Sequence, residues 1–251
     1  MFNTLKIKYY NKNQYIPDLK KAIPDKMHRG LPKLDSEKCN QCGKCKSVCP
    51  TGAIDLNPMR IDMGKCIFCG DCERVCPTGA ICFTNFNKLS ADTREGLIVS
   101  DSTNPDFFIT EAIKAKKEIK TCFGRSLKLR QVSAGGCNGC ELELNACSNA
   151  NFDMGRFGIE FVASPRHADG LVITGPITQN MAPALEDAYK CTPNPKVVIL
   201  TGACAISGGL FRPSNAINRS FLEKNKVDLY IPGCPIHPLT FINGILSFIG
   251  R

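Results

Sequence analysis

The spacing of apolar and polar positions divides the chain into two parts of different character. In the second part, short β-branched runs are separated by longer stretches rich in helix formers, such as Gln179–Tyr189. The strand-like runs are Gly158–Val162, Gly170–Thr174, Lys196–Thr201 and Val227–Ile231. Strands that alternate with helices predict a parallel sheet of the α/β class. The continuous apolar run Val197–Leu200 is typical of a strand buried on both faces.

The first part of the chain is less periodic. A polar arm over residues 1–35 contains Pro17, Pro24 and Pro32, and we expect it to be extended and without a core of its own. A small domain over residues 36–83 follows, because the segment Cys-Pro-Thr-Gly-Ala-Ile occurs there twice. Residues 84–123 form a connector with helical spacing, and residues 124–251 form the α/β domain.

Two runs of cysteines in the small domain have the same spacing. The runs are Cys39, Cys42, Cys45, Cys49 and Cys66, Cys69, Cys72, Cys76, each followed by proline. This C-x2-C-x2-C-x3-C-P pattern is typical of proteins with two [4Fe–4S] clusters, in which the fourth cysteine of each run binds the other run's cluster. We therefore predict that Cys76 completes the first set and Cys49 the second. A zinc site usually takes two C-x2-C pairs, which fits the pattern poorly.

A third group of cysteines is spread over the second part. Cys137 and Cys140 form half a site, and Cys204 and Cys234 each follow a predicted strand. Because ligands of an open parallel sheet gather outside the carboxyl ends of its strands, these four cysteines predict a third site there. Buried free thiols are the alternative. The other cysteines, Cys82, Cys122, Cys147 and Cys191, have no ligand spacing and are predicted to be structural, with Cys147 buried.

Several segments of the chain resemble known families. Residues 36–83 resemble bacterial two-cluster ferredoxins and the ferredoxin-like subunits of complex I and formate hydrogenlyase. Residues 124–248 resemble the small subunit of energy-converting, membrane-bound [NiFe] hydrogenases and the homologous 20 kDa subunit of NADH–quinone oxidoreductase. The motifs that carry this second resemblance are Gly124–Leu127, Ala134–Glu143, Phe157–Asp169, Thr174–Leu185 and Pro232–Pro238.

The resemblance implies a flavodoxin-like parallel-sheet domain behind a small α+β ferredoxin-like domain. It also implies that the third site holds the [4Fe–4S] cluster nearest to a catalytic centre in a separate large subunit. The quinone enzyme's subunit has two adjacent cysteines at the first ligand position, whereas Cys137 and Cys140 are separated by two residues, which favours the hydrogenase branch. Glu143, His167 and His237 lie in family motifs, and ordinary structural roles for them are equally open.

The composition limits the classes of function. The formal charge of +9 counts every cysteine as neutral. Three [4Fe–4S] clusters at about −2 each would lower the net charge to roughly +3. The basic segment 114–130 carries few aromatic residues, which argues against nucleic-acid binding. No apolar run approaches the roughly 20 residues that span a bilayer, and no cleavable signal precedes the cysteines, so we expect reduced thiols in the cytoplasm.

Together with these patterns, the resemblance implies a non-catalytic electron-transfer subunit with three [4Fe–4S] clusters, peripheral on the inner face of the cytoplasmic membrane. Its expected partners are a hydrogenase-type large subunit, other subunits of a membrane-bound complex, and a soluble ferredoxin or other electron-input subunit. An alternative is the equivalent subunit of a quinone-reducing or nickel-free relative. An iron–sulfur regulator that binds nucleic acid is a remote alternative.

Overall fold

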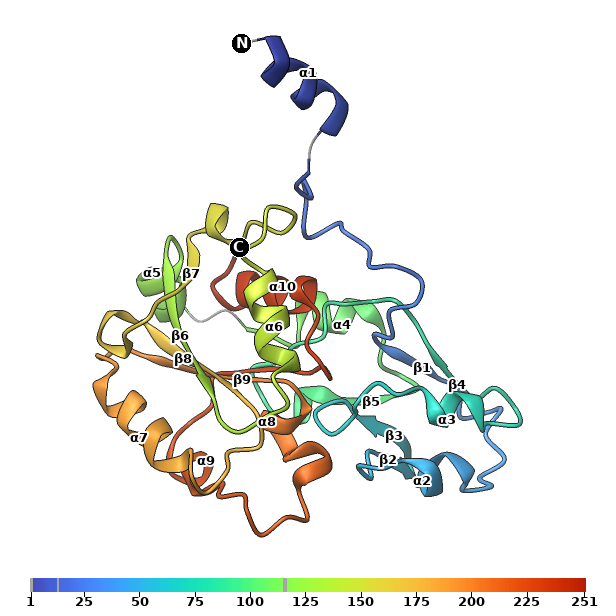
Figure 1. Cartoon of the computed structure of the whole chain (residues 1–251). Coiled ribbons are helices and arrows are strands. Elements are labelled where there is room, and N and C mark those ends of the chain that lie inside the picture. Colours follow the sequence, from blue (N-terminus) through green and yellow to red (C-terminus); the bar gives the residue numbers. More distant parts are fainter. Residues whose placement is uncertain (1, 13, 115–116) are drawn as a thin grey trace.

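A five-stranded parallel sheet forms the centre of the larger domain (Figure 1). The computed structural model describes residues 2–12, 14–114 and 117–251. The strands are β6 (Leu127–Ser133), β7 (Ile159–Phe161), β8 (Gly170–Thr174), β9 (Val197–Thr201) and β10 (Leu229–Ile231). Their order across the sheet is β10-β9-β8-β6-β7, and all neighbours are parallel. This is the flavodoxin-like order, so the predicted fold class is confirmed.

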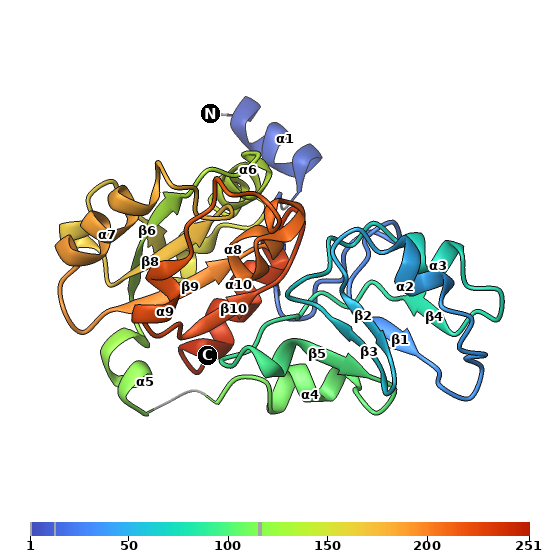
Figure 2. The ribbon, with the colours of Figure 1, turned by 90° about the horizontal axis from the view of Figure 1, so that it is seen from below.

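Helices cover both faces of the sheet (Figures 1 and 2). On one face, Leu171 and Ile173 of β8 pack in a cluster that includes residues of α7, α8 and α9. On the other face, Val172 packs with residues of α5, α6 and α10. The bounds are α5 (Lys117–Phe123), α6 (Gly139–Ala146), α7 (Ala182–Cys191), α8 (Ala203–Ser207), α9 (Ser220–Lys224) and α10 (Pro238–Phe248), with short 3-10 turns at Met154–Phe157, Pro165–His167 and Gly209–Phe211. The side chains of β8 and β9 are buried along their whole length, as the apolar runs predict.

Strand β6 is the one element of the sheet that the apolar runs do not indicate. Its sequence, Leu-Lys-Leu-Arg-Gln-Val-Ser, buries Leu127, Leu129 and Val132 but exposes Lys128 and Ser133. The polar residues interrupt the run, although β6 lies between β7 and β8. Tertiary packing therefore overrides local composition here.

The small domain consists of two similar halves. Its elements are α2 (Lys44–Val48), β2 (Ile54–Leu56), β3 (Met59–Asp62), α3 (Asp71–Arg74) and β4 (Ile81–Phe83), and they are joined by β1 (Pro32–Leu34) from the arm and by a 3-10 turn at Glu95–Leu97 and β5 (Ile98–Ser100) from the connector. β1 pairs with β4, and β3 pairs with β2 and β5, all antiparallel. Gln41 and Phe68 share a left-handed conformation, with φ of 54° and 57°. Gly43 and Gly70 share another, with φ of 76° and 78°. The sequence repeat is therefore a repeat of backbone conformation.

The arm is not extended throughout. Residues Phe2–Asn11 form helix α1, which projects from the body of the molecule (Figure 1). This decapeptide contains no proline or glycine, so nothing in its backbone opposes a helix. The prediction of an extended arm is wrong for these residues, whereas the proline-containing part that follows has no helix among its described residues. Residues 1 and 13 lie outside the described residues.

The connector packs the two domains together. The helical spacing of the connector corresponds to two helices, α4 (Pro105–Thr110) and α5, and residues 115–116 lie outside the described part. Ala91 forms an antiparallel bridge with Tyr230 of β10, with N–H···O distances of 3.0 and 2.8 Å. One hydrophobic cluster runs from Leu34 and Ile54 of the small domain to Leu171 of the sheet. The two domains therefore share part of their core.

Candidate metal centres

The eight cysteines of the small domain surround two separate cavities. One cavity is lined by Cys39, Cys42, Cys45 and Cys76, and the other by Cys49, Cys66, Cys69 and Cys72. Each cavity thus takes three thiols from one run and the fourth from the other run. The grouping is the crossed one that the spacing predicts. It places four sulfur donors around each cavity, which is the donor set of a [4Fe–4S] cluster.

The backbone around these cysteines supplies hydrogen bonds to sulfur. The Ala53 N–H donates to Cys49 Sγ at 3.3 Å, and the Ala80 N–H donates to Cys76 Sγ at 3.2 Å. The Phe68 N–H donates to Cys66 Sγ at 3.3 Å. Such bonds stabilise thiolates and tune the potential of iron–sulfur clusters.

Burial disfavours the thiolate form of these cysteines unless a bound metal balances the negative charge. It raises the pKa of Cys66 and of Cys72 to about 12. Burial also acts on Cys76, but hydrogen bonds from Thr78, Ala80 and Ile81 outweigh it and lower the pKa of that thiol. Binding of iron to buried thiols would therefore displace their protons, as is usual when metal binding is coupled to folding.

The third group of cysteines lies beyond the carboxyl ends of three strands. Cys137 and Cys140 follow β6, Cys204 lies in the first turn of α8 after β9, and Cys234 follows β10. The loops are joined directly, since the Ala203 N–H donates to the Gly233 carbonyl at 2.9 Å. Burial, together with the nearby thiols of Cys234 and Cys137, raises the pKa of Cys204 to about 11. The Cys140 thiol likewise interacts with Cys204 and Cys234, so the four cysteines are electrostatic neighbours.

Close packing around the third group leaves no room for extra side chains. A Cβ atom added to Gly202, whose φ is +88°, would lie 2.7 Å from Cys140 Sγ. One added to Gly209 would lie 3.0 Å from Cys204 Sγ. Glycine is required at such positions because the backbone must approach the sulfur atoms closely. The donor set again fits a cluster held by four thiolates.

Within the described residues, no group of three or more His, Cys, Asp or Glu side chains converges as one metal ion would require. A cubane has four irons at separate corners, so its thiolates surround a core and do not meet at one point. The four-cysteine cavities are arranged around a space in this way.

The three groups form a series. The Cys72 thiol of the second set interacts electrostatically with Cys45 of the first. The Cys234 thiol of the third group interacts with Cys69 of the second. The second set therefore lies between the first set and the third group.

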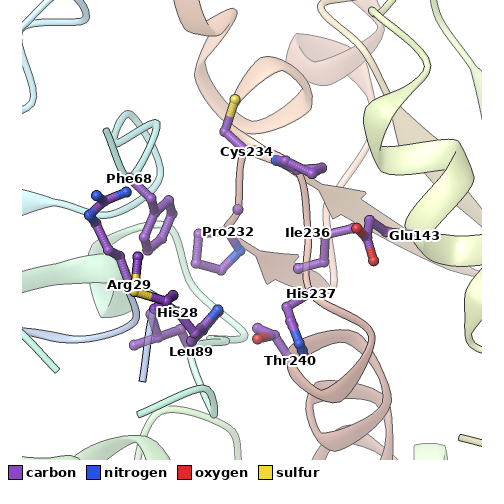
Figure 3. Close-up of a pocket in the computed structure, with 13 residues that line it drawn as sticks. His28, Arg29, Phe68, Leu89, Glu143, Pro232, Cys234, Ile236, His237 and Thr240 are labelled. Carbon is purple, nitrogen blue, oxygen red and sulfur yellow. The ribbon is translucent and has the colours of Figure 1, made fainter. Parts of the chain in front are cut away.

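A cavity of about 240 Å³ lies beside Cys234 and is lined by residues of the first part of the chain and of the α/β domain. Figure 3 shows Phe68 and Arg29 from the first part of the chain on one side, with Cys234, His237 and Glu143 from the α/β domain across from them. The His28 and His237 rings meet edge to face with centroids 4.9 Å apart. Burial, together with His28, lowers the pKa of His237 to about 4. Burial also raises the pKa of Glu143.

Other residues singled out in the sequence lie elsewhere. His167 is exposed in the turn Pro165–His167 and lines neither this cavity nor the two cysteine cavities. Cys147 is fully buried, as predicted. Cys82, Cys122 and Cys191 are exposed, so they are not part of the core as a structural role would suggest.

Sequence reasoning missed Glu141, which lies against the carboxyl ends of β6 and β8. Its side chain is only 7% exposed. Its Oε1 atom accepts hydrogen bonds from the Ser133 hydroxyl at 2.7 Å and the Thr174 hydroxyl at 2.5 Å. Ser133 ends β6 and Thr174 ends β8, and the strand order reverses between these two strands. Its position directly after Cys140, at a helix start, is the only signal in the sequence.

Comparison with known proteins agrees with this arrangement. Residues 137–248 match the family model of the NADH ubiquinone oxidoreductase 20 Kd subunit, and residues 38–80 match that of the 4Fe-4S dicluster domain. The probable membrane-bound hydrogenase subunit mbhJ of Pyrococcus furiosus is 40% identical over 123 residues, which cover 49% of this chain and 74% of that protein.

Two further relatives represent both branches of the resemblance. Formate hydrogenlyase subunit 7 of Escherichia coli is 44% identical over 50% of this chain and 49% of its own length. An NADH-quinone oxidoreductase subunit from Citrifermentans bemidjiense is 43% identical over 43% of this chain and 63% of its own length. With four cysteines beyond the strands of a flavodoxin-like sheet and a dicluster domain in front of it, the chain belongs to the family of the NADH–ubiquinone oxidoreductase 20 kDa subunit.

Proposed function

We propose that this chain is the iron–sulfur electron-transfer subunit of a membrane-associated oxidoreductase complex and holds three [4Fe–4S] clusters. The observation that carries the proposal is the series of cysteine groups, in which the second set lies between the first set and the third group. When bound, such clusters supply one-electron carriers. The cysteines of the two cavities and Cys137, Cys140, Cys204 and Cys234 would be their ligands.

The exposure of the third group supports a role at a subunit interface. Cys137 and Cys234 are exposed, although they belong to an otherwise well-packed set of loops. Leu142 beside Cys140, and Leu210 and Phe211 after Cys204, are apolar side chains that are 42–62% exposed. An exposed apolar surface around a redox site suits a partner protein that covers it. We infer that a large subunit with the catalytic centre binds there.

The spacing of Cys137 and Cys140 favours a hydrogenase-type large subunit. Two of the relatives are named as subunits of a membrane-bound hydrogenase and of formate hydrogenlyase. The relative from the quinone-reducing enzyme has a comparable sequence identity to this chain, so a quinone-reducing or nickel-free partner is the second candidate.

Attachment to the membrane would come through partner subunits. Among the described residues, none of the helices has the length and apolar character needed to cross a bilayer. The name of the hydrogenase relative places that protein in a membrane-bound enzyme. We infer a peripheral position on the cytoplasmic face, where a soluble ferredoxin or another input subunit would reach the first cysteine set through exposed Cys42.

The proposal is tested by isolating the complex from solubilised membranes under anaerobic conditions through a tag on this chain. We expect a co-purifying large subunit that contains nickel, and hydrogen evolution from reduced methyl viologen. Quinone reduction without nickel would favour the second candidate. Recovery of the chain with iron but without any large subunit would contradict the proposed function.

A further inference from the structure

Arg219 lies behind the third cysteine group and donates hydrogen bonds to four backbone carbonyls. Its Nη1 atom donates to Pro176 and to Cys204, both at 3.3 Å. Its Nη2 atom donates to Ala205 at 2.7 Å and to Ile206 at 3.0 Å. Three of these carbonyls belong to α8, the short helix that carries Cys204, and the fourth belongs to the loop after β8.

The carbonyls at the end of a helix have no partner within that helix. The planar guanidinium group can satisfy several of them at once, which a lysine ammonium on a flexible stem cannot do with the same geometry. Asn218, the preceding residue, donates its N–H to the Ile177 carbonyl at 2.8 Å. The segment around Arg219 thus ties α8 to the β8 loop and fixes the backbone that bears Cys204.

The guanidinium group also places a positive charge close to Cys204, with which it interacts electrostatically. It is largely buried, and burial lowers the pKa of Arg219, as do Arg212 and Arg94, whereas Cys204 raises it. An arginine nevertheless remains protonated in proteins. A buried charge is screened less by solvent and salt than an exposed one, so its effect on neighbouring groups persists at physiological ionic strength.

We propose that Arg219 is a positioning residue for the third cysteine site, which both holds Cys204 in place and raises the reduction potential of the cluster at that site. The inference rests on the proposed function, since it requires a cluster held by Cys137, Cys140, Cys204 and Cys234. Reduction adds a negative charge to the cluster, and a fixed positive charge beside it favours the reduced state. None of the motifs that carry the family resemblance includes Arg219.

The test is an EPR-monitored redox titration of the purified holoprotein and three variants. Arg219→Gln removes the charge and keeps an amide that can donate to some of the carbonyls. Arg219→Lys keeps the charge and loses the forked geometry. Arg125→Gln is the matched control, because it removes an exposed arginine that precedes β6, at the amino-terminal end of the strands and so opposite to the cysteine group.

In Arg219→Gln, we expect the ratio of reduced to oxidised third cluster at a fixed potential to fall about tenfold, which is about 59 mV for a one-electron couple. The signals of the other two clusters should titrate as in the unmodified protein. Arg219→Lys and Arg125→Gln should keep the original potential. An unchanged potential in Arg219→Gln with full iron content would overturn the inference.

Iron content separates failure of the inference from failure of the proposed function. Unmodified protein with only about eight irons per chain would refute the third cluster itself, whatever Arg219 does. If Arg219→Gln loses the third cluster, the potential of that cluster cannot be measured in this variant, and Arg219→Lys tests the role of the charge instead. Retention of the cluster with the original potential in Arg219→Lys supports the role of the charge, whereas retention of the cluster with a potential lowered by about as much as expected for Arg219→Gln refutes it. Equal loss of the cluster in both variants supports the positioning role of the fork.

Discussion

The hydroxyl of Thr174 donates a 2.5 Å hydrogen bond to the carboxyl group of Glu141, and this contact joins the end of β8 to the helix that begins beside Cys140. The Ser133 hydroxyl, at the end of β6, donates to the same oxygen. One buried acceptor therefore holds two strand ends and a cysteine-bearing helix together.

Loss of this acceptor should destabilise the α/β domain. We expect Glu141→Ala to cost about 2 kcal/mol, because it leaves a buried hydroxyl with only a long alternative contact to a carbonyl. Glu141→Gln retains an acceptor and should cost less than half of that. The measurement is the denaturant midpoint of the anaerobic holoprotein.

Glu160→Ala serves as control, because Glu160 is 55% exposed and pairs with Lys128 on the surface, where a loss below about 1 kcal/mol is usual. Equal effects of Glu141→Ala and Glu160→Ala would contradict the prediction.

Serine substitutions can test the crossed cysteine sets. If the cavities define the ligand sets, Cys76→Ser should remove the same EPR signal as Cys42→Ser, and Cys49→Ser the same signal as Cys69→Ser. Cys82→Ser, which changes an exposed cysteine outside both cavities, should remove none. A loss in Cys76→Ser that matches Cys69→Ser would show that each run binds its own cluster.

The close approach of Gly202 to Cys140 gives a steric test of the third group. Gly202→Ala would place a Cβ atom 2.7 Å from the sulfur, so the cysteine must move. We expect about four of twelve irons to be lost, as measured by iron analysis of anaerobically purified protein. Gly79→Ala is the matched control, since Gly79 also has a positive φ, of +64°, but has no atom within 4 Å of the added carbon. It should keep all its iron, and a comparable loss in both variants would point to backbone strain alone.

His237 links the stability of the α/β domain to pH. Its Nδ1 atom accepts a hydrogen bond from the Leu239 N–H at 3.1 Å at the start of α10, which requires that nitrogen to be unprotonated. Because the pKa of His237 is about 4 in the folded protein and near 6.5 when unfolded, the unfolded chain binds the extra proton first as pH falls. Stability contributed by His237 is therefore complete above pH 6.5 and is lost between about pH 6.5 and 4.

The check is the apparent melting temperature between about pH 4.5 and 7.5, which spans most of that window. His237→Asn, which can still accept at the helix start, should flatten the pH dependence and keep most of the stability at neutral pH. His237→Ala should flatten it as well but lower the stability by about 1 kcal/mol. His167→Ala, at an exposed position, should leave the profile unchanged. If the slope survives in His237→Asn, another group is responsible.

Most of the fold follows from local patterns in the sequence. The runs at β8 and β9 are continuous because both faces of the sheet are covered, and the repeated cysteine motif reproduces one backbone conformation twice. β6 escapes prediction because Lys128 and Arg130 interrupt its apolar positions, although its neighbours in space bury the remainder. α1 escapes prediction because little apolar periodicity marks a helix that projects away from the body of the molecule.

The candidate sites are predictable only as far as cysteine spacing extends. Glu141 and Arg219 act through hydrogen bonds to residues that are 8 to 43 positions away. A single glutamate or arginine carries no pattern that identifies such partners. The facing pair of His28 and His237 likewise exists only because the arm folds back over α10, which no local signal indicates.

The bridge between Ala91 and Tyr230 also affects how the chain can be divided. β10 is an edge strand of the parallel sheet. The free N–H and C=O groups of an uncovered edge strand can pair with a strand of another molecule. Ala91 occupies two of those groups on Tyr230. A fragment that begins at residue 124 would therefore keep every strand of the parallel sheet but leave the backbone N–H and C=O groups of Tyr230 on the β10 edge unpaired. The connector that carries Ala91 thus also covers part of this edge and keeps it from pairing with other molecules.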